Sequence, residues 1–127
     1  MSSTNFSSIS PTQVPEARDN HAMSFDSTRG RVVLFGGWSG SLPYFGDTWE
    51  LSGNVSSNIW TKLSTGGPSA REKPAMAFFS GGPYTLLFGG QISRTNPTRS
   101  QAFSDETWKW DGRSEEHTSE LQSPYVI

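Results

Sequence analysis

RVVLFGG at residues 31–37 and YTLLFGG at residues 84–90 decide the fold, because they are two copies of one pattern, 53 residues apart. Each is a run of β-branched, aromatic and aliphatic residues that ends at a Gly pair, which is typical of a buried strand followed by a turn. The same offset aligns PEARDNHAMSF at residues 15–25 with PSAREKPAMAF at residues 68–78. So many matches at one spacing indicate an internal repeat.

A third match lies downstream of each Gly pair. DTWE at residues 47–50 aligns with ETWK at residues 106–109 at an offset of 59, so the second copy carries six additional residues in this connection. The repeat predicts an antiparallel unit of up to four short strands per copy. The predicted strands are His21–Asp26, Arg31–Phe35, Asp47–Leu51 and Ile59–Leu63 in the first copy, and Pro74–Phe79, Tyr84–Phe88 and a strand around Trp108 in the second.

The Gly pairs end the second strand of each copy. Gly at such a place predicts either a backbone with positive φ or a large side chain pressed onto the main chain. Trp49 and Trp60 are the side chains that we expect to press on Gly36 and Gly37. The intervening segments, rich in Asp, Ser, Gly and Pro, predict hairpin turns.

These patterns carry a resemblance to a known family. A four-stranded unit that recurs about every 50 residues, with a Gly pair and spaced Trp residues in register, resembles the kelch repeat of bacterial kelch and galactose-oxidase-like β-propellers. The resemblance implies an all-β chain, a fragment of a kelch-type β-propeller with about two four-stranded antiparallel blades. Pro74 in place of His21, and the lack of a second Trp in copy two, depart from the pattern. The motif residues are Arg18, Gly36, Gly37, Trp49, Trp60, Arg71, Gly89, Gly90 and Trp108.

The resemblance divides the chain into parts. Residues 15–63 are expected to form one kelch blade, and residues 64–112 a second blade that lacks its outer strand. Within residues 1–14, the spacing of Phe6 and Ile9 predicts the remnant outer strand of a preceding blade.

The C-terminal segment, residues 113–127, differs from the rest. Its string RSEEHTSELQS resembles a sequencing adapter translated in frame, so we expect this segment to be non-native. The alternative is an acidic, helix-forming tail with Ser114 as its N-cap. Residues 1–112 hold nine Lys or Arg and nine Asp or Glu, so the net charge of −2 arises in the tail.

Composition excludes several classes of function. The chain has no Cys, which excludes thiol chemistry and Cys-based metal sites in this stretch. A net charge of −2 offers no basic surface, so no nucleic-acid partner is predicted. No apolar run approaches the length of a membrane span. The start of the sequence lacks a signal-peptide pattern, and the compartment stays open, with extracellular and periplasmic locations among the options.

The blade topology predicts a binding face. The loop between the second and third strands and the connection between successive blades emerge at the same end of an up-and-down sheet. Aromatic and Arg side chains are enriched in binding hot spots, and loops on a rigid scaffold commonly carry function. The candidate partner-binding residues in these loops are Trp38, Tyr44, Phe45, Arg94, Arg99 and Phe103.

Some of these residues have a second interpretation. Tyr44 and Phe45 could instead pack back onto the neighbouring blade. Arg18 and Arg71 recur at the start of the first strand of each copy, so we expect a structural role, such as bonding carbonyls of the adjacent blade. No catalytic residue, cofactor or metal ligand is predicted in this stretch.

The favoured function is a non-catalytic kelch β-propeller scaffold that binds a protein or carbohydrate through these loops. One alternative is an enzyme on the same fold, such as a galactose-oxidase-like copper oxidase or a sugar epimerase, whose catalytic residues lie outside this stretch. Another is a structural module of a larger secreted protein. A propeller needs about four to eight blades to close, so we expect two blades expressed alone to be poorly soluble or partly unfolded.

Overall fold

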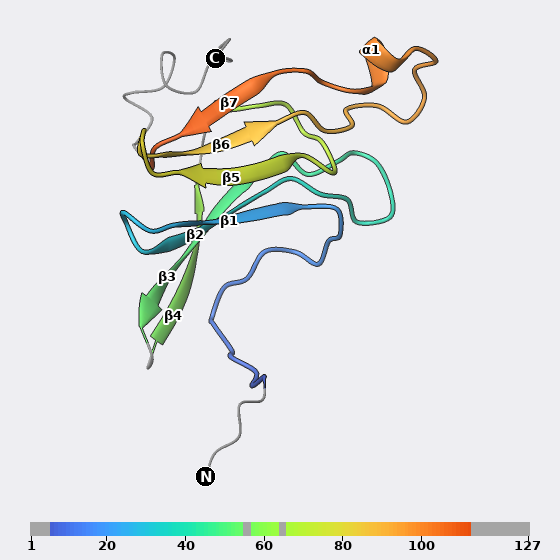
Figure 1. The fold of residues 1–127 in the computed structure, drawn as a ribbon. Helices are drawn as coiled ribbons and strands as arrows, with labels where there is room; N and C mark the ends of the chain where they lie inside the picture. The colour runs from blue at the N-terminus through green and yellow to red at the C-terminus, as the bar shows by residue number, and fades with distance from the viewer. Residues whose placement is uncertain (1–5, 55–56, 64–65, 113–127) are drawn as a thin grey trace.

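The computed structural model describes residues 6–54, 57–63 and 66–112. The first copy of the repeat forms a four-stranded antiparallel sheet in the order β1-β2-β3-β4 (Figure 1). Its strands are β1 (Ala22–Asp26), β2 (Arg31–Phe35), β3 (Thr48–Asn54) and β4 (Ser57–Leu63). Each strand pairs with the next along the chain, so the sheet is a simple meander.

The second copy forms a three-stranded antiparallel sheet in the order β5-β6-β7. A short helix, α1, lies in the long connection between its last two strands, where the second copy carries its additional residues. The elements are β5 (Ala75–Phe79), β6 (Tyr84–Phe88), α1 (Arg99–Ala102) and β7 (Thr107–Trp110).

The strands confirm the all-β prediction. β2 and β6 have the predicted bounds, and β1 and β5 begin one residue later than predicted. Pro74 precedes β5, as expected for a residue without a backbone N–H. Phe6 and Ile9 lie in no strand and are exposed. An outer strand needs a neighbouring strand to pair with, so their place in a preceding blade stays a prediction. The predicted tail, residues 113–127, lies outside the described residues.

Both sheets share one register despite their different loop lengths. Leu34 of β2 pairs with Trp49 of β3, and Leu87 of β6 pairs with Trp108 of β7. Residues directly opposite in paired strands point to the same face of the sheet. The additional residues of copy two are therefore absorbed in the loop, and the two sheets present the same pattern of side chains.

The two sheets pack face to face, with β1 beside β5 (Figure 1). Phe35 from the first sheet meets Leu87 and Trp108 from the second, and Met76 of β5 packs against this group. Burial of these apolar side chains is the main favourable term that holds the sheets together.

The Gly pair after β2 has the predicted positive φ, but the neighbour that requires it differs from the prediction. Gly36 has φ 77°, and a Cβ built there would lie 2.6 Å from the carbonyl oxygen of Arg71. The expectation that Trp49 and Trp60 press on this pair is wrong. They pack against each other edge to face instead, with ring centroids 6.4 Å apart. The close approach is that of the second sheet's backbone.

Candidate functional site

The loops of both sheets gather at one end of the molecule, at the right in Figure 1. The β2–β3 loop, the β6–β7 loop with α1, and the segments that precede β1 and β5 all lie there. We call this region the loop end. The β1–β2 and β5–β6 hairpin turns lie at the opposite end, which we call the hairpin end.

A buried Arg, an acidic residue and a Trp anchor the loop end of the first sheet. Arg18 forms an ion pair with Asp47 at 2.6 Å and donates a hydrogen bond to the carbonyl of Gly36 at 3.1 Å. The indole Nε1 of Trp49 donates to the second carboxylate oxygen of Asp47 at 2.8 Å. Burial disfavours the charge of Asp47, but the hydrogen bonds from Arg18 and Trp49 outweigh it and lower its pKa.

The second sheet repeats this arrangement. Arg71 pairs with Glu106 at 3.1 Å and donates to the carbonyl of Gly89 at 3.0 Å. Trp108 Nε1 donates to Glu106 at 3.0 Å, and this bond, assisted by Arg71, lowers the pKa of Glu106. Each Arg thus bonds a carbonyl of its own sheet, whereas we expected a carbonyl of the adjacent one. Both Arg side chains therefore hold the end of their own sheet together, and the structural role proposed for them stays a prediction.

A second polar cluster joins the two sheets at the loop end. Glu72, just before β5, is fully buried and accepts a hydrogen bond from Asn20 Nδ2 of the first sheet at 2.8 Å. Arg94 of the β6–β7 loop pairs with Glu72 at 2.8 Å. The guanidinium of Arg94 also stacks on Trp38 of the β2–β3 loop, 3.7 Å from the ring centroid. Burial opposes the charge of Glu72, yet Asn20 and Arg94 lower its pKa.

Tyr44 belongs to this cluster and is buried. Its side chain is 7% exposed, and its buried hydroxyl has no hydrogen-bond partner within the described part of the chain. Burial and the negative charge of Glu72 raise the pKa of the hydroxyl. Tyr44 therefore packs inward beside Glu72 of the second copy, and its part in binding a partner stays a prediction.

The remaining predicted residues form two further contacts. Phe45 lies half-buried beneath the guanidinium of Arg18, 3.8 Å from it, so it too packs inward. Arg99 of α1 lies over the ring of Phe103 at 4.7 Å, and Phe103 is partly exposed. The six predicted residues thus separate into three groups. Trp38, Tyr44 and Arg94 lie at the sheet junction, Phe45 lies under Arg18, and Arg99 and Phe103 form an exposed pair at α1 and the residue after it.

A shallow hollow lies beside this junction. The segment before β1 forms one side of it and the β2–β3 loop the other. It is lined by Glu16, Ala17, Ser39, Ser41, Leu42, Pro43, Tyr44 and Phe45. The hollow confirms that the two kinds of loop predicted to share a face lie side by side.

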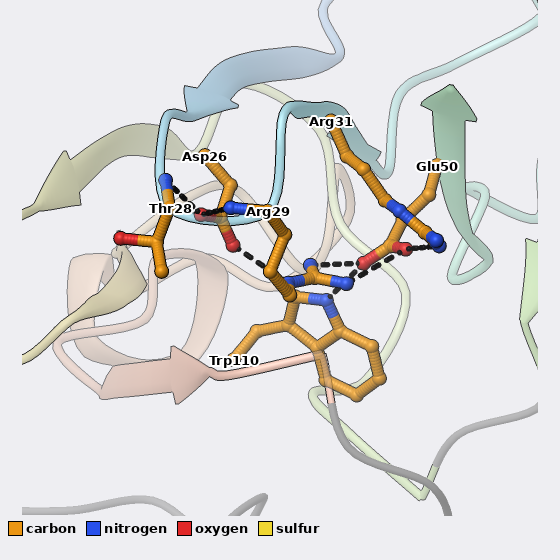
Figure 2. A network of polar contacts seen from close by, with 6 residues as sticks. All are labelled: Asp26, Thr28, Arg29, Arg31, Glu50 and Trp110. Atoms are coloured by element: carbon orange, nitrogen blue, oxygen red, sulfur yellow. Dashed lines mark hydrogen bonds and ion pairs between the residues drawn. The ribbon is translucent and has the colours of Figure 1, made fainter. Parts of the chain in front are cut away.

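The hairpin end has its own polar network (Figure 2). Asp26 accepts backbone hydrogen bonds from Thr28 and Arg29, as expected of an Asp that starts a turn. Arg29 bridges Asp26 and the buried Glu50. Trp110 Nε1 of the second sheet donates to Glu50 at 2.8 Å, so the network joins the sheets. Burial opposes the charge of Glu50, but Arg29 and Trp110 lower its pKa.

Glu72 and Glu50 join the sheets, yet neither is among the residues predicted from the sequence. The sequence offers a pattern that could have predicted Glu72, because polar pairs follow the repeated Arg in both copies: Asp19-Asn20 in the first and Glu72-Lys73 in the second. No repeated pattern predicts Glu50, since Lys109 occupies its position in the second copy.

Two features of the described residues bear on the other classes of function. Residues 6–54, 57–63 and 66–112 hold no group of three His, Asp or Glu side chains arranged to bind a metal ion. In the same residues, no helix is both long and apolar enough to cross a membrane.

Comparison with known proteins gives one partial likeness. No family model matches the chain. A stretch of 78 residues is 36% identical to part of dynein regulatory complex subunit 7 of Chlamydomonas reinhardtii. The match covers 60% of this chain and 6% of that protein, so the chain spans a small part of the relative's length.

Proposed function

We propose that residues 15–63 and 64–112 are two blades of a kelch-type β-propeller, and that the chain acts as a non-catalytic scaffold. Three observations support this proposal: two meander sheets with one register, the same buried Arg–acid–Trp arrangement in each, and face-to-face packing of one sheet on the next. Such packing of repeated sheets is the organising feature of propellers.

The observation that carries the function is the Arg94–Trp38 stack on buried Glu72. It fixes loops from both sheets against each other and leaves part of the Arg94 guanidinium at the surface. The side chain of Arg94 is 37% exposed. A planar cation held on an aromatic ring is a favourable contact for a partner, because little side-chain entropy remains to be lost on binding.

The ligand class that we propose is a protein. Arg and aromatic residues at the loop end are the types enriched in protein hot spots. The similar Chlamydomonas protein is named as a subunit of a regulatory complex, which is in keeping with a role in protein assembly. The alternative ligand is a carbohydrate bound at the same loops, and the experiment below distinguishes it from a protein.

The test compares Arg94→Ala with Arg31→Ala in the full chain. Each Arg is partly exposed and paired with a buried Glu, but Arg31 lies at the hairpin end, which makes it a matched control. Peptides are selected on the chain from a displayed random library, and the chain is also applied to an array of immobilised glycans.

We expect Arg94→Ala to weaken the selected peptides about tenfold, or roughly 1.4 kcal/mol, while Arg31→Ala changes their affinity less than about twofold. Equal effects of the two substitutions would contradict a loop-end site. Glycan binding alone, lost in Arg94→Ala, would overturn the choice of a protein ligand. Binding to neither probe would overturn the proposed function.

A further inference from the structure

The two sheets of one copy meet in one interface, which we call the filled interface. The repeat places one side of the same interface on the outer face of each sheet, where no described sheet packs against it; we call these the unfilled halves. In the filled interface, Phe35 points from the first sheet to the second and is 2% exposed. Met76 points from the second sheet back toward it. The repeat gives each a counterpart 53 residues away: Phe88 for Phe35, and Met23 for Met76.

These counterparts are uncovered. Phe88 is 53% exposed and Met23 is 47% exposed, whereas Leu34 and Trp49, the counterparts of Leu87 and Trp108, are already buried beside Met23. Since the two sheets share one register, Phe88 points away from the first sheet and Met23 points away from the second. The two halves therefore lie on opposite outer faces of the stack, and one copy cannot bring them together.

Backbone groups show the same pattern. In the filled interface, Gly37 N–H of the first sheet donates to Arg71 C=O of the second at 2.9 Å. The counterparts are Gly90 N–H and Arg18 C=O, and neither has a hydrogen-bond partner within the described part of the chain. A donor on one outer face thus matches an acceptor on the other.

Residues 20 and 73 extend this correspondence. Lys73 N–H donates to Asn20 C=O at 2.6 Å, and both residues have positive φ, 58° and 56°. The shared and uncommon conformation shows that the two copies aim their backbone groups alike. Asn20 N–H and Lys73 C=O, the counterpart pair, have no partner among the described residues.

Charge also matches across the unfilled halves. In the filled interface, the Asn20 side chain donates to Glu72 at 2.8 Å. The corresponding side chains on the outer faces are Lys73 and Asp19, which are exposed and carry opposite charges. The pair that an added sheet would bring together is therefore an ion pair.

We propose that a second copy of this chain covers these faces head to tail, with the β5–β7 sheet of one copy packed on the β1–β4 sheet of the next. The interface is heterologous, so it continues into a ring or an open array according to the rotation between sheets. The inference rests on the repeated packing of the sheets and not on loop-end binding. Its readout is self-association, so its failure is distinguishable from failure of the proposed function.

Disulfide trapping tests the orientation, because the chain has no Cys of its own. Met23→Cys and Phe88→Cys are made as separate single variants, mixed in equal amounts and oxidised. We expect a disulfide-linked dimer in the mixture and little in either variant alone. The double variant Phe35→Cys with Met76→Cys, whose positions border the same buried cluster within one copy, serves as the control for whether this pair of positions can be cross-linked.

Efficient dimerisation of Met23→Cys or Phe88→Cys alone would overturn the head-to-tail arrangement, since it would show a symmetric contact. Absence of any cross-link in the mixture, with the control cross-linked, would overturn the proposal altogether.

Sedimentation velocity supplies a second test on the unmodified chain. We expect concentration-dependent association that Phe88→Glu abolishes while the far-ultraviolet circular dichroism spectrum is retained. Lys73→Glu is expected to weaken association at least tenfold, and Lys73→Glu with Asp19→Lys to restore it. A monodisperse monomer at about 100 µM, where micromolar dissociation constants are visible, would overturn the proposal.

Discussion

Phe35 and Phe88 occupy the same position in two sheets built from the same repeat, yet one is buried and the other is half exposed. Their strands have the same length, and each pairs with its neighbour in the same register. The difference is that a sheet follows the first copy and no described sheet follows the second.

For these two Phe residues, the repeat determines the position of the side chain within its sheet, while the presence of a further sheet determines its burial. A stacked repeat cannot bury its apolar face alone, and its stability is shared between intrinsic and interface terms. Substitutions at counterpart positions therefore separate the stability of the single sheet from the stability that the contact between sheets adds.

Phe35→Ala should have the largest effect. It removes a buried aromatic side chain from the contact between the sheets, which costs about 3–5 kcal/mol in the free energy of unfolding. Phe88→Ala should cost less than about 1 kcal/mol, because its ring is already half in water. Urea denaturation of both variants at low concentration measures the difference, and equal losses would remove the basis of the comparison.

Glu50→Ala should have the next largest effect. It leaves Arg29 with Asp26 alone as its buried partner and removes the hydrogen bond from Trp110 of the second sheet, at a cost of about 2–4 kcal/mol. Its counterpart Lys109→Ala should change the free energy of unfolding by less than about 1 kcal/mol. A Glu50→Ala variant as stable as Lys109→Ala would show that the hairpin end does not join the sheets.

Acid should destabilise the chain through Asp47 more than through Glu106. Both have a pKa lowered on folding, so their stabilisation is complete above the unfolded values, which are about 3.9 for Asp and 4.3 for Glu. It is lost as pH falls from there through the lowered folded values. Asp47 is the better shielded of the two.

Stability is measured by thermal melts between about pH 6 and pH 2. Asp47→Asn should flatten the acid dependence more than Glu106→Gln does. The reverse order would show that solvent exposure does not govern the strength of the two ion pairs.

Arg99→Ala should have the smallest effect, about 0.5 kcal/mol or less, because its stack on Phe103 is exposed. Arg94→Ala should cost more, since it also leaves Glu72 unpaired in the interior. Chemical denaturation measures the free energy of unfolding of both variants. A larger loss of stability for Arg99→Ala than for Arg94→Ala would show that the more important loop contact is the one made by α1.

Much of the local structure could be predicted from the sequence. The bounds of β2 and β6 followed from the β-branched and aromatic runs, because these residues fit a pleated surface. β3 and β4 extend further toward each other than predicted, because Ser52, Gly53 and Asn54 continue the pairing of β3 where a turn was expected. The shared register of the two sheets followed from the repeat, since equal patterns specify equal pairing.

The contacts between sheets could not be predicted in the same way. Gly36 faces the Arg71 carbonyl, and Tyr44 lies against Glu72, because two sheets meet there. Such partners are far apart in sequence, and no local spacing encodes them. A pattern of aromatic and Arg residues in loops predicted a binding surface, but burial decided that Tyr44 serves the interface and that Arg94 remains exposed in part.

A double-mutant cycle between Phe35→Ala and Met76→Ala tests most directly that the sheets stack through the repeated interface. Urea unfolding of the two single variants, the double variant and the original chain gives their coupling energy, for which we predict roughly 0.5–3 kcal/mol. The same cycle on Phe88→Ala and Met23→Ala, at a dilution where copies do not associate, should give coupling near zero. Equal coupling in the two cycles, or none between Phe35 and Met76, would contradict the account.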